Sequence, residues 1–397
     1  MSQTPQQQHL ASQLQGGLPY SAPGSPISAA RCIGCIGLGN IGGSIAKNLA
    51  IHFSRSQHHA KHSIVLWNRT RAKADQIVAE VEAKTEKDGG IASVSVANSV
   101  EDLVKECDII LTSLSNDAAV TDMYEIIIKT LKEDRPTTSG NVHKKIVVDT
   151  STIYPTLTGQ LDTRVSAIPH TTFVAAPVFG ATAVAANAQL VICLAGDYRS
   201  KKEIAYLLVP AAGKKVIDLG GNVEKAVAFK LVGNSHIVSS IELLAQTHTL
   251  ADKVGLSRQT LHNFLAEMLP APPLIKYSER LLNDDFDGNT GFNINSGLKD
   301  VHHIQRLSAE YNCPVPFLDT VRLDFSRSQP IYPHRTRNIL NCQTGRHIVT
   351  ARALNAARPE NERNPNMDWS AMVSASRVAA GLDPFNSKNV SSDQFLA

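Results

Sequence analysis

The spacing of apolar and polar positions changes once along the chain, near residue 221. Before that point, short apolar runs alternate with segments in which apolar residues recur every three or four positions. Apolar strands that alternate with helices predict a sheet covered on both faces, the doubly wound parallel α/β fold. The predicted strands are 32–36, 63–68, 92–97, 108–114, 145–150, 171–178, 189–196 and 215–220.

After residue 221 the strand signal stops. Residues 222–252 keep helical spacing without a proline, which predicts one helix of roughly 30 residues. Further helices are predicted at 258–269, 272–283, 297–311, 347–357 and 368–381. We therefore expect a Rossmann-type domain over 31–221 and an all-α domain over 222–397, with the long helix joining them.

Two segments fit neither domain. Residues 1–30 contain no Asp, Glu, Lys or Arg and are rich in Gln, Ser, Pro and Gly, so we expect a disordered tail. Residues 322–346 hold five Arg, one acid and two Pro, with no clear period. Joining 317–321 directly to 347–357 restores apolar spacing. The segment is either an atypical insertion, such as translated intron sequence, or a basic surface loop.

Composition narrows the classes of function. Of the 397 residues 43% are apolar, and 39 basic against 36 acidic side chains give a net charge of +3. So small a charge lacks the field that a nucleic-acid or membrane-surface binder uses. Six cysteines are too few for a disulfide scaffold, and no apolar run is long enough to span a bilayer. With no signal or transit pattern, we expect a cytoplasmic protein without nucleic-acid or membrane partners.

A glycine-rich turn follows the first predicted strand and opens a helix. It reads Gly37-Leu38-Gly39-Asn40-Ile41-Gly42, the G-x-G-x-x-G pattern in its strand-turn-helix context. The first glycine permits the turn, the second lets the backbone approach a pyrophosphate, and the third lets helix and strand pack closely. This turn predicts dinucleotide binding, against the alternative of a purely structural glycine turn.

The second predicted strand ends in Asn68-Arg69-Thr70. Enzymes that bind NAD place an acidic residue here to bind the ribose hydroxyls. An arginine with polar neighbours suits a 2′-phosphate instead, which favours NADP, although NAD remains possible. The alternative is that Arg69 is simply exposed at a strand end.

The long helix carries Lys230 and Asn234, which share one face because they are four residues apart. By spacing alone, a lysine among apolar neighbours extends its ammonium to solvent or faces a cleft. A second lysine, Lys299, begins a later helix, and nothing in the spacing places the two lysines together.

These motifs together resemble the β-hydroxyacid dehydrogenases, relatives of 6-phosphogluconate dehydrogenase that include 3-hydroxyisobutyrate dehydrogenase. The resemblance covers residues 31–321 and 347–382. It rests on IGLGNIGGSIAKNL, LWNRTRAKA, DIILTSLSNDAAV, VVDTSTIYP, AAPVFGATAVAANAQL, AFKLVGNSHIVSSIELLAQ, GLKDV and DWSAM, in that order.

The resemblance implies roles for individual residues. It assigns the pyrophosphate to Gly37–Gly42, and the adenosine ribose and its phosphate to Asn68, Arg69 and Thr70. It implies that Leu114, Ser115 and Thr152 line the cofactor site. Lys230 matches the family's catalytic lysine, Asn234 its hydrogen-bonding partner, and Lys299 a second lysine near substrate and cofactor. The implied active site lies between the two domains, and family members are usually homodimers.

The implied chemistry is hydride transfer on a nicotinamide, with Lys230 as general acid or base. An ordinary lysine has a pKa of about 10.4, and burial beside a second cation, such as Lys299, would lower it.

The predicted substrate loop departs from the family pattern. The family has a serine and several glycines where this chain reads Phe179-Gly180-Ala181-Thr182, followed by Val184 and Ala188. An aromatic ring in place of a donor for a carboxylate favours a different, less polar substrate. The activity of 3-hydroxyisobutyrate dehydrogenase itself is therefore not expected.

We expect no metal site. Cys32 and Cys35 fall in a predicted core strand, and neither the histidine-rich loop before residue 63 nor His302-His303 comes with a second ligand cluster. The loop with Asp284, Asp285 and Asp287 lacks the later glutamate of a calcium site.

The sequence thus predicts an NADP-dependent oxidoreductase acting on a small aldehyde, ketone or hydroxy compound. Two alternatives stay open. One is an imine reductase, although those enzymes usually replace the lysine. The other is an NADP-binding scaffold or interaction protein without catalysis.

Overall fold

The computed structural model describes residues 18–20, 31–55, 62–90, 92–134, 144–315 and 343–386. The chain divides into two compact units, of which unit 1 ends at Lys230 and unit 2 begins at Leu231. Each unit has its own apolar core.

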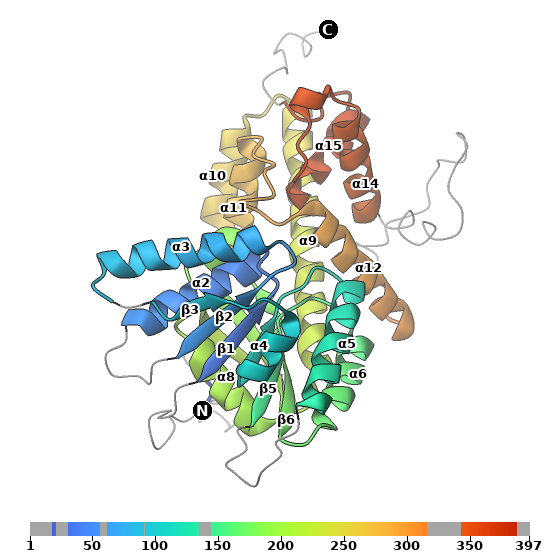
Figure 1. Cartoon of the computed structure of the whole chain (residues 1–397). Coiled ribbons are helices and arrows are strands. Elements are labelled where there is room, and N and C mark those ends of the chain that lie inside the picture. The colour runs from blue at the N-terminus through green and yellow to red at the C-terminus, as the bar shows by residue number, and fades with distance from the viewer. Residues whose placement is uncertain are drawn as a thin grey trace, which may run out of the picture. The chain divides into compact units, whose positions relative to one another are not determined.

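Unit 1 is built on a mixed β-sheet (Figure 1). Its parallel part has the strand order β3-β2-β1-β4-β5-β6, so the order reverses between β1 and β4. Beyond it, β8 runs antiparallel to β6 and β7 and parallel to β9. The strands are β1 (Cys32–Ile36), β2 (Ser63–Trp67), β3 (Val94–Val96), β4 (Ile109–Thr112), β5 (Lys145–Asp149), β6 (Thr171–Ala175), β7 (Val178–Phe179), β8 (Leu190–Gly196) and β9 (Gly213–Asp218).

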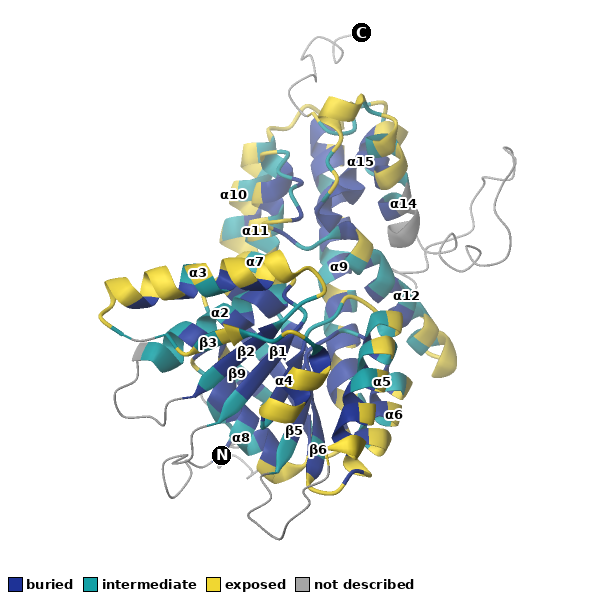
Figure 2. Ribbon diagram, viewed as in Figure 1, coloured by how far each residue is buried: buried dark blue, intermediate teal, exposed yellow. Residues whose placement is uncertain are grey.

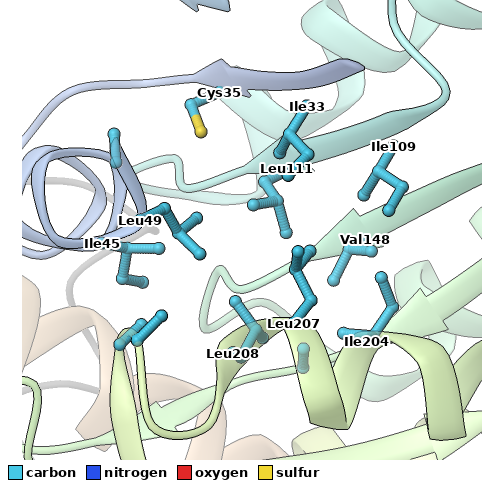
Figure 3. Packing of buried hydrophobic residues seen from close by; sticks show 14 of the residues in the cluster. Ile33, Cys35, Ile45, Leu49, Ile109, Leu111, Val148, Ile204, Leu207 and Leu208 are labelled. Carbon is cyan, nitrogen blue, oxygen red and sulfur yellow. The ribbon is translucent and has the colours of Figure 1, made fainter. Parts of the chain in front are cut away.

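Helices cover both faces of this sheet because its strands are apolar on both sides. In β4, Ile109 and Leu111 pack toward α2 and α8 (Figure 3). Ile110 packs on the other face, in the core with α4 and α5. The strands are largely buried and the helices expose their outer faces (Figure 2). The helices of unit 1 are α2 (Asn40–Arg55), α3 (Arg71–Lys87), α4 (Val100–Glu106), α5 (Asp117–Glu133), α6 (Pro155–Ser166), α7 (Thr182–Ala186) and α8 (Tyr198–Leu208). The predicted doubly wound fold is confirmed.

Unit 2 is helical in its described part, as predicted. Its core joins Leu231, Val238 and Ile241 of α9 to residues of the following helices and to Trp369. The elements are α9 (Glu224–Lys253), whose first turns belong to unit 1, then α10 (Arg258–Met268), α11 (Pro272–Leu282), α12 (Ile294–Glu310), α14 (Gln343–Ala356), the 3₁₀ turns η2 (Glu360–Glu362) and η3 (Trp369–Met372), and α15 (Val373–Ala379).

The two compact units divide at residue 231, nine residues after the predicted start of the second domain at 222. The core that contains Ile36 of β1 also includes Val223, directly before α9, and Ala226 and Val227 in the first turn of α9. The sequence pattern marks where strands stop, but these apolar side chains keep the start of the helix in unit 1.

Other predicted boundaries also need correction. The predicted strand 171–178 is two strands, β6 and β7, separated at Ala176 and Pro177. Helix α8 ends at Leu208, before Pro210.

Parts of the two atypical segments are also described. Residues 18–20 lie inside the predicted tail, yet Tyr20 is 7% exposed and its carbonyl accepts a hydrogen bond of 3.0 Å from the Tyr206 hydroxyl. The tail prediction is wrong for these three residues, and the rest of 1–30 lies outside the described residues. Helix α14 begins at Gln343, inside the predicted insertion 322–346, and residues 322–342 lie outside the described part.

Among the helices that the structure describes, none is both long enough and apolar enough to cross a membrane.

Helix α7 ends in a left-handed residue that is not glycine. Ala188 has φ of +54°, its amide donates to Ala185, and the amide of Gln189 donates to Val184, the bonding of a Schellman cap. Glycine adopts this conformation without a steric penalty, whereas the Cβ of alanine comes too close to the backbone carbonyl that follows it.

We therefore expect Ala188→Gly to raise the free energy of unfolding by about 1 kcal/mol in urea titrations. The matched control is Ala183→Gly, at an exposed helical position of α7, which should lower it by about 0.5–1 kcal/mol. Destabilisation by Ala188→Gly would show that the cap is not formed.

Candidate functional site

The glycine turn joins β1 to α2 and brings three backbone segments into close approach. Gly37 has φ of +90°, and a Cβ there would lie 2.3 Å from the carbonyl oxygen of Ser113. A Cβ on Gly42 would lie 2.1 Å from the carbonyl oxygen of Gly37. These two positions therefore accept only glycine, because a side chain would push the turn away from α2 and from the loop after β4.

Gly39 is different, because a Cβ at this position would meet no atom within 4 Å. Gly39 and Asn40 are exposed, whereas Leu38 and Gly42 are buried and Ile41 is half-buried. The open space lies beside the first turn of α2, whose amide groups lack helical partners and which carries no acidic residue. The turn therefore fits a pyrophosphate, for which it offers backbone donors and unoccupied space.

A small pocket lies beside this turn, at the carboxyl ends of β1, β4 and β5. This is the point where the strand order reverses, and doubly wound sheets bind ligands there. The pocket is lined by Cys35, Ile36, Gly37, Gly42, Ile45, Leu111, Thr112, Ser113 and Thr150.

Asn68 braces the glycine turn from the end of β2. Its Oδ1 accepts a hydrogen bond of 3.0 Å from the amide of Leu38, and its Nδ2 donates to the carbonyl of Thr70 at 3.0 Å. The side chain thus links the two loops, a structural role that the sequence did not predict. Arg69 and Thr70 are exposed beside it. Contacts of these three residues with an adenosine ribose stay a prediction.

A buried hydrogen-bond network shapes the loops after β4 and β5. Asp149 is 2% exposed and accepts bonds from the hydroxyls of Thr112 at 2.8 Å and Ser151 at 2.7 Å. The Ser151 hydroxyl in turn accepts a bond of 2.9 Å from the amide of Leu114. The network sets the backbone of Leu114, next to the exposed Ser115, and lies beside Thr152.

The phenol of Tyr124 stays protonated and can donate a hydrogen bond to this network. Burial, followed by the charge of Asp149, holds the pKa of its phenol well above the ordinary value. The hydroxyl lies 3.1 Å from the Thr112 hydroxyl, so it can donate there while Thr112 donates to Asp149. Sequence reasoning missed Asp149, Ser151 and Tyr124, although D-T-S directly after a buried strand was a signal.

Lys230 is buried, with 6% exposure, and lies over an aromatic ring. Its Nζ is 4.2 Å from the centroid of the Phe179 ring, a cation–π contact. Phe229 meets Phe179 edge to face, with the centroids 6.0 Å apart and the planes at 90°. Lys230 is close enough to Cys193 of β8 for its charge to act on that thiol. Burial nevertheless dominates and raises the pKa of Cys193 to about 12.

The predicted substrate loop runs from β7 into α7. Phe179 pairs with Val191 of β8, and Gly180 follows with φ of +146°. Ala181 is the N-cap residue of α7 and Thr182 is its first residue. All four residues of the predicted loop are half-buried.

In unit 2, one carboxylate links two of the predicted residues. Asn234 is 2% exposed, and its Nδ2 donates to Oδ2 of Asp300 at 2.6 Å. The ammonium of Lys299 lies 3.0 Å from the other oxygen of Asp300, which is itself 2% exposed. Sequence reasoning missed Asp300, although it is adjacent to Lys299 in GLKDV.

The structure therefore brings together Lys230 and Phe179 in unit 1, and Asn234 and Lys299 around Asp300 in unit 2. Lys230 and Asn234 are on one helix, α9, as predicted. The approach of Lys299 to Lys230 stays a prediction. Within the described ranges, no group of three His, Cys, Asp or Glu side chains could hold a metal ion.

Comparisons with curated proteins give relatives of about one-quarter identity. An NADH-dependent oxidoreductase, ucdB, of Aspergillus ustus is 26% identical over 65% of this chain and 81% of its own length. The uncharacterized oxidoreductase YfjR of Bacillus subtilis (strain 168) is 26% identical over 74% of this chain and 92% of its own. The human cytokine-like nuclear factor N-PAC is 26% identical over 78% of this chain and 50% of its own.

Solved structures show the same fold. A 3-hydroxyisobutyrate dehydrogenase of Mycobacterium tuberculosis, with L-serine, superposes with a TM-score of 0.61. It is 22% identical and the match covers 88% of this chain and 100% of that one. A 3-hydroxyisobutyrate dehydrogenase of Salmonella typhimurium gives a TM-score of 0.62 at 14% identity, over 87% and 99% of the two chains.

Residues 32–221 match the family described as the NAD binding domain of 6-phosphogluconate dehydrogenase. This range contains the glycine turn, the pocket at the strand-order reversal and the substrate loop. Residues 32–221 therefore match an NAD binding domain of the 6-phosphogluconate dehydrogenase family, and the chain is similar over most of its length to proteins named as oxidoreductases and 3-hydroxyisobutyrate dehydrogenases.

Proposed function

We propose that the protein is an NADP-dependent oxidoreductase that interconverts a small aldehyde or ketone and its alcohol, with Lys230 as general acid and base. The observation that carries the proposal is the burial of the Lys230 ammonium in the unit that also holds the dinucleotide turn. A buried lysine costs desolvation energy, so its presence at a matched family position favours a chemical role.

The turn and the chain around it would hold the cofactor. Backbone amides at Gly39 and at the start of α2 would bind the pyrophosphate, and the exposed Arg69 would pair with a 2′-phosphate. Leu114, Ser115 and Thr152 would line the nicotinamide half. When bound, the nicotinamide supplies or accepts the hydride.

Lys230 would transfer a proton to and from the substrate oxygen. In reduction its ammonium donates a proton to the carbonyl oxygen, and in oxidation the neutral amine takes the hydroxyl proton. The amide of Asn234 is oriented by Asp300, because its Nδ2 donates to that carboxylate. Its Oδ1 is then the atom that faces a donor, such as a substrate hydroxyl. Lys299, held by the same carboxylate, would contact substrate or cofactor.

The choice of NADP over NAD rests on Arg69 and on the absence of an acid at the end of β2. Relatives of both kinds occur: the Aspergillus relative is named as NADH-dependent, whereas Psf3 was solved with NADP+. Psf3 is 18% identical, with a TM-score of 0.61, so it supports the fold alone. The proposed preference for NADP over NAD therefore depends on Arg69.

The second and third glycines of the turn are expected to respond differently to alanine. Gly39→Ala adds a methyl group to the space proposed for the pyrophosphate, so NADPH binding should weaken at least about tenfold while the melting temperature stays unchanged. Gly42→Ala should lower the melting temperature because its methyl group meets the Gly37 carbonyl. Titration of NADPH fluorescence and thermal unfolding measure both, and normal NADPH affinity of Gly39→Ala would place the pyrophosphate elsewhere.

Replacing Arg69 tests the choice of cofactor. Loss of a charge-assisted pair costs about 1.5–3 kcal/mol, so Arg69→Ser should raise the Kd of NADPH about 10- to 100-fold. The Kd of NADH, which lacks the 2′-phosphate, is the internal control and should change little. An equal effect on both cofactors would remove Arg69 from phosphate recognition.

Lys230→Met tests the proton transfer. The variant should lose about 10²- to 10⁴-fold in kcat for carbonyl reduction, the usual contribution of a general acid, and still bind NADPH. Lys225→Met is the matched control, since Lys225 is exposed on the same helix. Full turnover by Lys230→Met would refute the role. Tight NADPH binding by the unaltered protein with no turnover of aldehydes, ketones or imines would favour a scaffold without catalysis.

A further inference from the structure

Phe179 is held firmly where the substrate loop begins. Its backbone belongs to β7, which pairs with β8 at Val191. The next residue, Gly180, has a left-handed φ, and a Cβ there would lie 2.6 Å from the Leu190 side chain. The strand on one side and this tight turn on the other constrain the backbone at Phe179, and the contacts of its ring with Lys230 and Phe229 define where the ring lies.

The ring contacts the group that would transfer the proton. The Nζ of Lys230 lies 4.2 Å from its centroid, and Phe229 supports the ring from the side at 90°. The face of a benzene ring carries partial negative charge and attracts a cation. Phe179 therefore orients the ammonium and stabilises its charge without contributing a full negative charge of its own.

The same arrangement is unfavourable for an anionic substrate. From Pro177 to Ala181 the loop has no side chain that can donate a hydrogen bond, and the first hydroxyl is that of Thr182. A carboxylate placed against this stretch would lose its hydration without gaining a hydrogen bond from any of its side chains.

We propose that Phe179 determines specificity, and that this site accepts uncharged carbonyl compounds with an apolar substituent and discriminates against those that carry a carboxylate near the carbonyl. The ring would act on two groups at once: it excludes the substrate carboxylate and positions the ammonium of Lys230. This inference rests on the proposed function, because it assumes that Lys230 acts on the substrate oxygen.

The test compares carbonyl pairs that differ by one carboxylate, such as butanal with 4-oxobutanoate and benzaldehyde with 4-carboxybenzaldehyde. NADPH oxidation gives kcat/KM for each member with the full-length protein. We expect the uncharged member to be preferred at least about tenfold, the effect of losing one ionic hydrogen bond. Phe179→Ser, which adds a hydroxyl donor and removes the ring, should reduce this preference at least about tenfold.

Two further variants keep the test decisive. Ala186→Ser places a hydroxyl on the exposed side of α7 and should leave the preference unchanged. Phe179→Leu stays apolar but has no ring, so it should keep the preference while losing the cation–π contact. In that variant the high-pH limb of the reduction rate should move to lower pH, because the ammonium is less stabilised. A merely structural role of Phe179 would not shift this limb.

Failure of the inference can be told from failure of the proposed function. Equal or better turnover of the carboxylates by the unaltered protein overturns the role of Phe179 and leaves carbonyl reduction standing. Turnover of neither member of any pair removes the proposed function, and the inference with it. If Phe179→Ser does not fold in a thermal unfolding control, the preference of the unaltered protein and the pH profile of Phe179→Leu still decide the outcome.

Discussion

The site depends on how closely the backbone of β1 and its glycine turn can approach α2 and the loop after β4. Gly37 and Gly42 have no room for a Cβ, because the carbonyls of Ser113 and Gly37 occupy that space. This close packing places the start of α2 at the reversal of strand order. Asn68 then braces the turn from β2, and Ser151 braces the neighbouring loop through the amide of Leu114. These contacts hold the backbone on either side of Gly39, and no atom lies within 4 Å of the place that a Gly39 Cβ would take.

The ammonium groups of the two lysines at the matched family positions are stabilised by different partners. The ammonium of Lys230 lies over the Phe179 ring, which offers only a quadrupole, whereas that of Lys299 pairs with the full charge of Asp300. A carboxylate holds an ammonium in its charged form, and an aromatic face does so less strongly. The lysine that we propose as general acid and base is therefore the one that lies over a ring, and the lysine proposed to contact substrate or cofactor is the one beside a carboxylate.

Much of the fold was predictable from the sequence, because its signals are local. The period of the apolar residues predicted the strands, the long helix and the all-helical second unit. The boundary was less predictable, since only packing shows that Val223, Ala226 and Val227 belong to the core of unit 1. In the same way, Pro177 divides a continuous apolar run into two strands that pair differently.

For the site, the sequence could indicate which residue types were present but not their partners. The glycine pattern predicted the turn because each position has its own steric requirement. The contacts of Asp300 with Asn234, and of Phe179 with Lys230, join residues 66 and 51 positions apart. The spacing of residues along the chain does not reveal such a contact. The sequence could therefore not predict the surroundings of either lysine. From the sequence, Phe179 was only an unexpected aromatic residue. In the structure its ring contacts Lys230.

The central claim is that the dinucleotide site and Lys230 form one hydride-transfer enzyme. The most direct measurement uses NADPH deuterated at C4 in both positions, mixed with uncharged aldehydes and ketones, and follows the products by mass spectrometry. We expect an alcohol that has gained one deuterium at the former carbonyl carbon, in proportion to the NADPH consumed. Saturable NADPH binding with no deuterated product from any carbonyl would contradict it.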